Sequence, residues 1–367
     1  MKKSVNRVDD NRDGILKNWL KLLLFLYLFV LSIGMIKKAS GVFAPSIRDY
    51  LFGNVGPLKA VSLGWFSTAI AQSSGAVSSV VITFTGNSIV DLPTAIYILV
   101  GASLGTTITA LIISLVTVSS KRKDFRHGFE IGLCYAIYSA ILIFVVLVLE
   151  YFFGLFSMVS LFLAEGLQGR VRYLQIPDLI GIITDPLVGP LFERFNSLLL
   201  FLGSFVVLIF TLRFIGGSVV DVFGGEDESR RFINRHFDSK IKAYFLGVVL
   251  TAIVFSSSIT IGLLVPLAVA RLIGLRRSIP FILGADLGTF SDTLLVALIV
   301  GKTSAIAAAL AYALFAIAGA LIFLPNTDWL YKMTKYVSKR LIHISRKKAF
   351  YLLILFLLLP LGVVLIF

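Results

Sequence analysis

TAIAQSS (residues 68–74) and GASLGT (residues 101–106) recur in this chain as TAIVFSS (residues 251–257) and GADLGT (residues 284–289). Each position of the second set lies 183 residues after its counterpart, so the two sets align without a gap. The repeated letters are mainly serine, threonine and glycine within an apolar chain. Such residues mark places where a backbone in lipid can leave a regular helix and where hydroxyl groups can replace the water around an ion. The repeat predicts two copies of one structural unit.

The composition indicates a membrane protein that crosses the bilayer several times. Hydrophobic residues make up 57% of the 367 residues and charged residues only 15%, whereas about 25% of a typical soluble domain is charged. The formal net charge is +14. The basic residues lie between apolar stretches, where they set membrane topology, so nucleic acid is not an expected partner. The single cysteine, Cys134, cannot form a disulfide within the chain.

Apolar stretches of about 20 residues predict full crossings. We expect them at residues 20–36, 95–118, 129–150, 197–215, 280–300, 305–324 and 349–367. Two further apolar stretches, residues 55–89 and 240–273, are interrupted by QSSG (residues 72–75) and FSSS (residues 255–258). Each is long enough for two helices of half the bilayer depth, which predicts a re-entrant hairpin with its tip at the serines.

The basic residues support a cytoplasmic amino terminus. With both hairpins re-entrant, most of the 34 lysine and arginine residues fall on the cytoplasmic side. The predicted fold class is therefore an all-α polytopic membrane protein: an inverted-topology repeat of helix, re-entrant hairpin, broken helix and helix, plus one extra C-terminal helix. The predicted parts are a first unit (residues 1–150), an extracellular linker (151–196), a second unit (197–324) and a cytoplasmic linker with the extra helix (325–367). This order makes the carboxyl terminus extracellular.

The two hairpin tips are expected to meet near the bilayer midplane. A helix begins at each tip, and its N–H groups and positive dipole end favour an anion. Serine hydroxyls both donate and accept hydrogen bonds, so they suit an oxyanion and a cation alike. The glycine pairs of GASLGT and GADLGT predict unwound stretches whose carbonyls can coordinate Na⁺. Asp286 falls in the second stretch, and since its span holds no lysine or arginine, its expected partner is a cation or a proton.

Enzymatic chemistry is not expected from this sequence. The chain has no G-x-S-x-G motif, and its histidines, His127, His236 and His343, all lie outside the predicted spans. A serine within the membrane therefore has no imidazole to act as its base.

At the tips and breaks, the chain resembles the type II sodium–phosphate cotransporter family, as a prokaryotic member. That family has two Gln-Ser-Ser-Ser tips, each followed by a Gly-Ala-Asn-Ile-Gly-Thr-Thr break, and the likeness covers roughly residues 20–324. The resemblance implies a plasma-membrane symporter that couples Na⁺ to inorganic phosphate uptake by alternating access, without an organic cofactor. It implies phosphate binding by Ser73, Ser74, Gly75, Ser256, Ser257 and Ser258. It implies sodium binding by Gln72, Ser73, Ser103, Thr106, Thr107, Ser256, Thr260, Asp286, Thr289, Ser291 and Asp292.

Four positions depart from the family pattern. Gly75 replaces a tip serine, Phe255 replaces a tip glutamine, and Ser103 and Asp286 replace asparagines. These departures leave open another oxyanion, such as sulfate or arsenate, or a phosphorylated small molecule or lipid carrier, with proton coupling. A non-transporting scaffold or sensor, whose polar loop at residues 216–237 recruits a partner, is the third alternative. Assembly into a homo-oligomer is also left open.

Overall fold

The computed structural model describes residues 19–36, 38–39, 55–116, 122–173, 179–222, 237, 239–269, 271, 273–342 and 346–366. These residues are almost all helical, and no strand occurs among them. After the helix Trp19–Ile36, the elements in chain order are α2 (Pro57–Ala71), α3 (Ser74–Gly86), α4 (Leu92–Val116), α5 (Arg122–Phe153), α6 (Leu155–Tyr173), α7 (Leu179–Arg194), α8 (Ser197–Val222), α10 (Lys240–Val254), α11 (Ser257–Gly262), α12 (Leu264–Val269), α13 (Leu275–Gly288), α14 (Phe290–Val300), α15 (Thr303–Phe323), α16 (Thr327–Ile342) and α17 (Arg346–Ile366).

Five described helices are long and apolar enough to cross a membrane: Trp19–Ile36, Leu92–Ile112, Arg126–Phe153, Leu275–Val300 and Thr303–Phe323. They confirm the spans predicted at residues 20–36, 95–118, 129–150, 280–300 and 305–324, of which residues 117–118 lie outside the described part. The other two predicted spans fall in α8 and α17. These helices are 26 and 21 residues long, and the apolar stretches described within them are Ser197–Thr211 and Ile354–Ile366.

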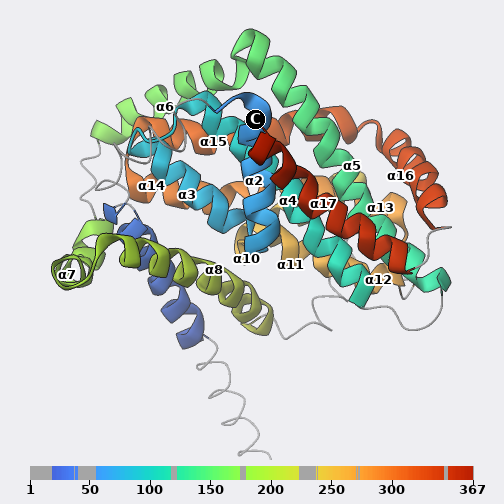
Figure 1. The fold of residues 1–367 in the computed structure, drawn as a ribbon, viewed down its shortest axis with the longest axis horizontal. Helices are drawn as coiled ribbons and strands as arrows, with labels where there is room; N and C mark the ends of the chain where they lie inside the picture. Colours follow the sequence, from blue (N-terminus) through green and yellow to red (C-terminus); the bar gives the residue numbers. More distant parts are fainter. Residues whose placement is uncertain are drawn as a thin grey trace, which may run out of the picture.

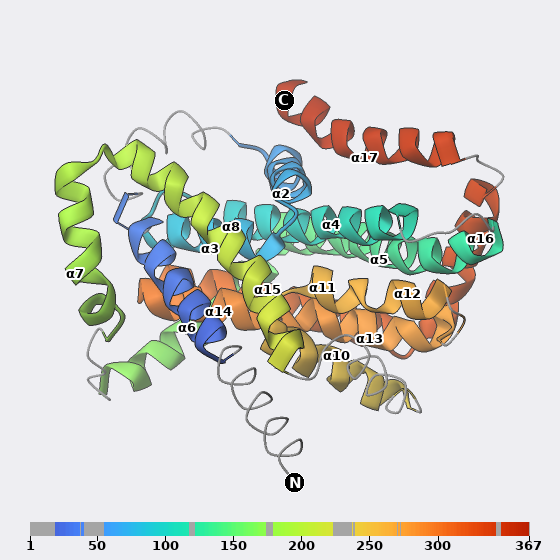
Figure 2. The ribbon, with the colours of Figure 1, turned by 90° about the horizontal axis from the view of Figure 1, so that it is seen from below.

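The helical core has an outer helix from each half packed on opposite sides. Helix α2 packs on α4, and α10 packs on α13. Figure 1 shows the helices along the chain, and Figure 2 shows α2 and α10 on opposite sides of the core formed by α4, α5, α13 and α15. Helix α4 packs on α5, and α15 packs on both α13 and α14. The two sequence repeats thus supply corresponding helix pairs to one core.

The chain breaks at both serine tips, as the sequence predicts. The residue that follows α2 is Gln72, with a φ of 55°, and the residue that follows α10 is Phe255, with a φ of 53°. A left-handed residue after a helix usually is glycine, because side chains there meet the backbone. Two different side chains in the same unfavourable conformation indicate that the surrounding packing imposes this turn. The orientation of each hairpin relative to the bilayer stays a prediction.

The prediction that the glycine pairs interrupt both long helices is wrong for the first copy and holds for a single residue in the second. Helix α4 runs through GASLGT without a break. In the second copy, one residue, Thr289, separates α13 from α14, and its N–H still bonds to the carbonyl of Asp286 at 3.3 Å. Few carbonyls are therefore released for a cation in either copy.

The repeated glycines instead allow helices to pack in close contact. A Cβ added to Gly101 would lie 2.0 Å from the carbonyl oxygen of Val61, and one added to Gly284 would lie 1.9 Å from that of Tyr244. Val61 and Tyr244 are themselves counterparts in the repeat, 183 residues apart. Glycine is required here because the backbones of α2 and α4, and of α10 and α13, touch where a side chain would lie.

The halves also pack against each other in a reciprocal way. Helix α11, after the second tip, contacts α4 of the first half, while α3, after the first tip, contacts α14 of the second half. The second arm of each tip therefore lies against the long helix of the opposite half.

The predicted linker, residues 151–196, holds two helices, α6 and α7. Helix α6 packs along α15. The turn before it is fixed by Glu150, whose carboxylate accepts hydrogen bonds from the N–H groups of Phe156 (2.8 Å) and Ser157 (3.1 Å). Of the polar loop predicted at residues 216–237, residues 216–222 belong to α8 and Phe237 is buried. Residues 223–236 lie outside the described part.

Candidate functional site

The first serine of each tip caps the helix that follows. The Oγ of Ser73 accepts a hydrogen bond from the N–H of Ala76 (3.2 Å), and the Oγ of Ser256 accepts one from the N–H of Ile259 (3.2 Å). The two caps are equivalent in the repeat. A capping hydroxyl uses its oxygen as acceptor and keeps its own proton to donate. Both predicted phosphate ligands can therefore still donate to an oxyanion.

Asp286 places a carboxylate within the helical core. It is fully buried, and its carboxylate accepts three hydrogen bonds from hydroxyls: from Ser103 (3.0 Å) and Tyr135 (3.1 Å) on Oδ1, and from Tyr138 (2.8 Å) on Oδ2. The ion pairs found among the described residues do not include it. A carboxylate has about four acceptor sites, so Oδ2 keeps one for a further ligand.

The contact between Ser103 and Asp286 joins two equivalent positions of the repeat. They are 183 residues apart in sequence, which is the offset of the two copies. Ser103 lies on α4 and Asp286 on α13, both at the third position of the repeated GASLGT and GADLGT. The two halves therefore meet at the same point of their own structures.

A second pair of equivalent positions differs between the halves. Beside the first tip, Thr109 donates to the side-chain oxygen of Gln72 at 3.3 Å. The counterparts of these residues are Asp292 and Phe255. Phenylalanine offers no hydrogen bond, and both oxygens of Asp292 are buried without a hydrogen-bond partner. A buried carboxylate without partners is costly, so this position calls for a bound cation or a proton.

Three buried hydroxyls near the tips also have no hydrogen-bond partner: those of Thr68, Thr251 and Ser257. Thr68 and Thr251 are counterparts, on the last turns of α2 and α10. Buried hydroxyls nearly always find a partner. Further unpartnered hydroxyls lie at Ser78, Ser139 and Thr327. The first three lie next to the two tips, where a polar ligand would satisfy them.

The other predicted sodium ligands with hydroxyl groups donate to backbone carbonyls, most of them one turn earlier in the chain. Thr106 donates to Ala102 (3.1 Å), Thr107 to Leu104 (2.7 Å), Thr260 to Ser256 (2.9 Å) and Thr289 to Ala285 (3.3 Å). Ser291 donates to the carbonyls of Gly288 (2.9 Å) and Ala252 (3.2 Å). The proton of each hydroxyl is therefore used in a hydrogen bond, while the lone pairs of its oxygen stay available as acceptors. These are acceptors of the kind that an alkali cation uses, and they do not form a single cluster.

The hydrogen bonds of the described residues do not join the two tips to each other. What they bring together is Ser103 with Asp286, and Gln72 with Thr109. Ser74, Gly75, Ser257 and Ser258 open the helices α3 and α11, and their meeting across the core stays a prediction.

The tyrosines that surround Asp286 were not predicted from the sequence as part of the site. Tyr135 and Tyr138 of α5 stack with ring centroids 6.3 Å apart and are fully buried. Gly319 of α15 makes room for Tyr138, because a Cβ there would lie 2.5 Å from its hydroxyl. A third buried phenol, Tyr312 of α15, packs with its ring centroid 4.7 Å from that of Phe315. The sequence pattern that could have indicated them is a pair of tyrosines three residues apart within an apolar span.

The arrangement is suited to holding a hard cation by oxygen atoms. No group of three or more histidine, cysteine, aspartate and glutamate side chains that could hold a metal ion occurs within the described ranges. A cation here would instead be held by one carboxylate together with hydroxyl and carbonyl oxygens, as sodium is in transporters.

Five helices that are long and apolar enough to cross a membrane, packed around buried polar residues, define an integral membrane protein. The chain belongs to the Na⁺/Pi-cotransporter family, whose sequence model matches residues 24–164 and 207–345. The second match begins 183 residues after the first, which is the offset of the repeat. The predicted resemblance to the type II family is thus confirmed.

Proteins with similar sequences are named as sodium-dependent phosphate transport proteins. Sodium-dependent phosphate transport protein 2A of Mus musculus is 24% identical over 92% of this chain and 66% of its own length. The protein of that name in Rattus norvegicus is 24% identical over 92% of this chain and 65% of its own. Sodium-dependent phosphate transport protein 2B of Bos taurus is 28% identical over 48% of this chain and 26% of its own. This chain spans just under two thirds of the 2A proteins. No solved structure matches it.

Proposed function

We propose that this protein is a secondary active transporter that couples sodium entry to uptake of inorganic phosphate by alternating access. The observation that carries the proposal is the buried Asp286, which is held by hydroxyls and by no cationic side chain within the described residues. Its charge can be balanced by an ion that enters and leaves. The family to which the chain belongs, and the names of its relatives, supply the identity of the two solutes.

The proposed architecture is an inverted repeat, with units at residues 1–150 and 197–324. Support comes from the Ser103–Asp286 contact, because a residue meets its own counterpart when a two-fold axis runs close to both. The reciprocal packing of α11 on α4 and of α3 on α14 fits the same axis. In an inverted repeat, each half can adopt the conformation of the other half. When the two halves swap conformations, an outward-open state becomes an inward-open state. The amino terminus is proposed to be cytoplasmic and the carboxyl terminus extracellular.

Phosphate is proposed to bind between the tips. Helix α3 begins at Ser74, and Ser73 caps only the N–H of Ala76. The N–H groups of Ser74 and Gly75 cannot bond within the helix and point toward its amino-terminal end. An anion is favoured there by these donors and by the helix dipole. The second tip would contribute the hydroxyls of Ser256, Ser257 and Ser258 as further donors to the anion.

Sodium is proposed to bind at the two buried carboxylates. Asp286 keeps one acceptor site on Oδ2, and Asp292 keeps all of its sites. Charged groups within a membrane cost about 2.5 to 3.5 kcal/mol on insertion scales. Binding of sodium offsets that cost and, by adding positive charge to the core, favours phosphate. This gives a physical reason for coupling of the two solutes.

Uptake of labelled phosphate into proteoliposomes tests the proposal. We expect accumulation under an inward sodium gradient and little without one. Replacing the sodium gradient by a proton gradient separates sodium from proton coupling, and unlabelled sulfate or arsenate in excess separates phosphate from other oxyanions. Absence of uptake under every gradient would favour a scaffold or sensor over a transporter.

Substitution of Ser257 and Ser256 separates substrate binding from helix capping. The Ser257 hydroxyl has no partner in the protein, so Ser257→Ala is expected to abolish uptake while the melting temperature stays unchanged. Ser256 caps α11, so Ser256→Ala is expected to lose about 1 kcal/mol of stability as well. Thermal unfolding and uptake are measured on the same preparations. Normal uptake by Ser257→Ala would exclude this hydroxyl from the phosphate site.

A further inference from the structure

A strongly basic pocket lies apart from the carboxylate core, between α5 and α16. Its volume is about 730 Å³, within the range of pockets that hold small ligands. Six basic side chains line it: Arg126, His127, Arg271, Lys332, Lys335 and Lys339. Two tyrosines, Tyr331 and Tyr336, complete the wall and add hydroxyl donors. We call this the cationic pocket.

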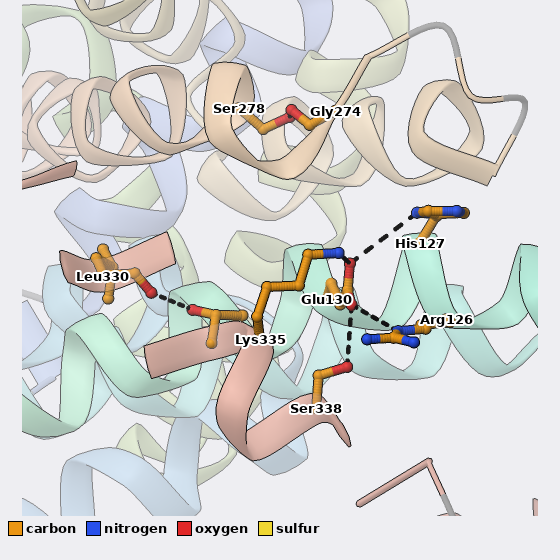
Figure 3. A network of polar contacts seen from close by, with 9 residues as sticks. Arg126, His127, Glu130, Gly274, Ser278, Leu330, Lys335 and Ser338 are labelled. Atoms are coloured by element: carbon orange, nitrogen blue, oxygen red, sulfur yellow. Dashed lines mark hydrogen bonds and ion pairs between the residues drawn. The ribbon is translucent and has the colours of Figure 1, made fainter. Parts of the chain in front are cut away.

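A buried glutamate fixes two of these cations. Glu130 of α5 is fully buried and accepts hydrogen bonds from Arg126 (2.9 Å), Lys335 (2.5 Å) and Ser338 (3.1 Å). His127 lies 4.0 Å from the same carboxylate. Figure 3 shows these side chains converging on Glu130 from the two helices. Because the carboxylate orients Arg126 and Lys335, little side-chain freedom is left for a ligand to remove.

The positive charge of the pocket exceeds what this carboxylate balances. Arg271 has a further interaction of its own, but Arg126, Lys332, Lys335 and Lys339 alone carry four positive charges, and Glu130 offers a single negative charge. Membrane topology requires basic residues on one side of the bilayer, but it does not require them to converge on one cavity. Like charges held around a cavity repel one another, so an anion there stabilises the arrangement.

Phosphoryl groups suit this set of donors. Arginine binds phosphate through two parallel hydrogen bonds, lysine binds it as a compact charge, and both bonds are charge-assisted. Glu130 leaves three of the four positive charges on Arg126, Lys332, Lys335 and Lys339 unbalanced. One orthophosphate neutralises at most two of them, so an anion with several phosphoryl groups fits the excess better. We propose that the cationic pocket binds a ligand that carries two or more phosphoryl groups, either free in solution or on a lipid headgroup.

Titration calorimetry with inorganic triphosphate tests the proposal. The purified protein is kept in sodium and saturating orthophosphate, so that the transport site does not contribute. We expect binding that weakens with added salt and weakens about tenfold or more in a Lys332→Gln/Lys339→Gln double variant. Both lysines are exposed, so the fold is expected to be kept. The matched control is Lys240→Gln/Lys302→Gln, which removes the same charge at exposed residues outside the pocket.

Nanodiscs identify the source of the phosphoryl groups. Triphosphate affinity is measured in discs of phosphatidylcholine with and without phosphatidylinositol bisphosphate. Weaker triphosphate binding in the bisphosphate discs assigns the pocket to a lipid headgroup, and equal binding assigns it to a soluble ligand. No binding of triphosphate in neutral discs overturns the proposal, and so does an equal loss of affinity in the pocket variant and in its control.

Discussion

Replacing Asp286 with asparagine is expected to raise the sodium concentration for half-maximal phosphate uptake by between about tenfold and a hundredfold. A charge-assisted contact contributes about 1.5 to 3 kcal/mol, and about 1.4 kcal/mol corresponds to a tenfold change in affinity. The fold is expected to persist, because the three hydroxyl partners from Ser103, Tyr135 and Tyr138 can each donate or accept toward an amide. Uptake at varied sodium concentration measures the effect.

The control for this substitution is Asp185→Asn. Asp185 is an exposed carboxylate on α7, so its change alters the net charge equally and is expected to leave sodium activation unchanged. If Asp286→Asn and the unchanged protein were activated by the same sodium concentration, Asp286 would not be a sodium ligand. If uptake by Asp286→Asn lost its dependence on pH instead, the carboxylate would carry a proton.

The second large effect is expected from adding one methyl group to the repeated glycines. In Gly101→Ala or Gly284→Ala, the new Cβ would meet the carbonyl oxygen of Val61 or Tyr244 at about half the normal contact distance. Both obstacles are backbone atoms, so whole helices must separate to relieve the clash. We expect a loss of about 3 kcal/mol or more in stability, measured as a lowered melting temperature and a loss of monodisperse protein.

Gly203→Ala provides the matched comparison. Gly203 also lies within a helix, α8, but a Cβ there meets nothing within 4 Å. Alanine favours helix by up to about 1 kcal/mol over glycine, so this variant is expected to be as stable as the unchanged protein or more so. Equal melting temperatures for Gly101→Ala and Gly203→Ala would show that α2 and α4 do not depend on the close contact.

Local chemistry predicted the breaks at the tips but could not predict their geometry. The serine runs after Gln72 and Phe255 marked where each helix stops, and the crossing helices followed from apolar length. The left-handed conformation of Gln72 and Phe255 could not be predicted, because neither residue favours it and the surrounding packing decides.

Glycine was ambiguous at Gly101 and Gly284 for a different reason. Glycine weakens a helix and also lets another backbone approach it, and a sequence shows only that the side chain is missing. Here close approach decides, and α4 stays unbroken. The phenols around Asp286 were missed because Tyr135 and Tyr138 lie on α5, outside the duplicated motifs. Only tertiary packing brings that helix to the carboxylate.

The contact of Ser103 with Asp286 limits how the two halves can evolve. A side chain that contacts the equivalent side chain of the other copy can be neutral in both copies, because two neutral polar groups can donate hydrogen bonds to each other and accept them. It cannot be acidic in both without two carboxylates about 3 Å apart, where they repel strongly. A charge gained at this point by one copy therefore excludes the same charge from the other, and the duplicated gene product must become asymmetric at its centre.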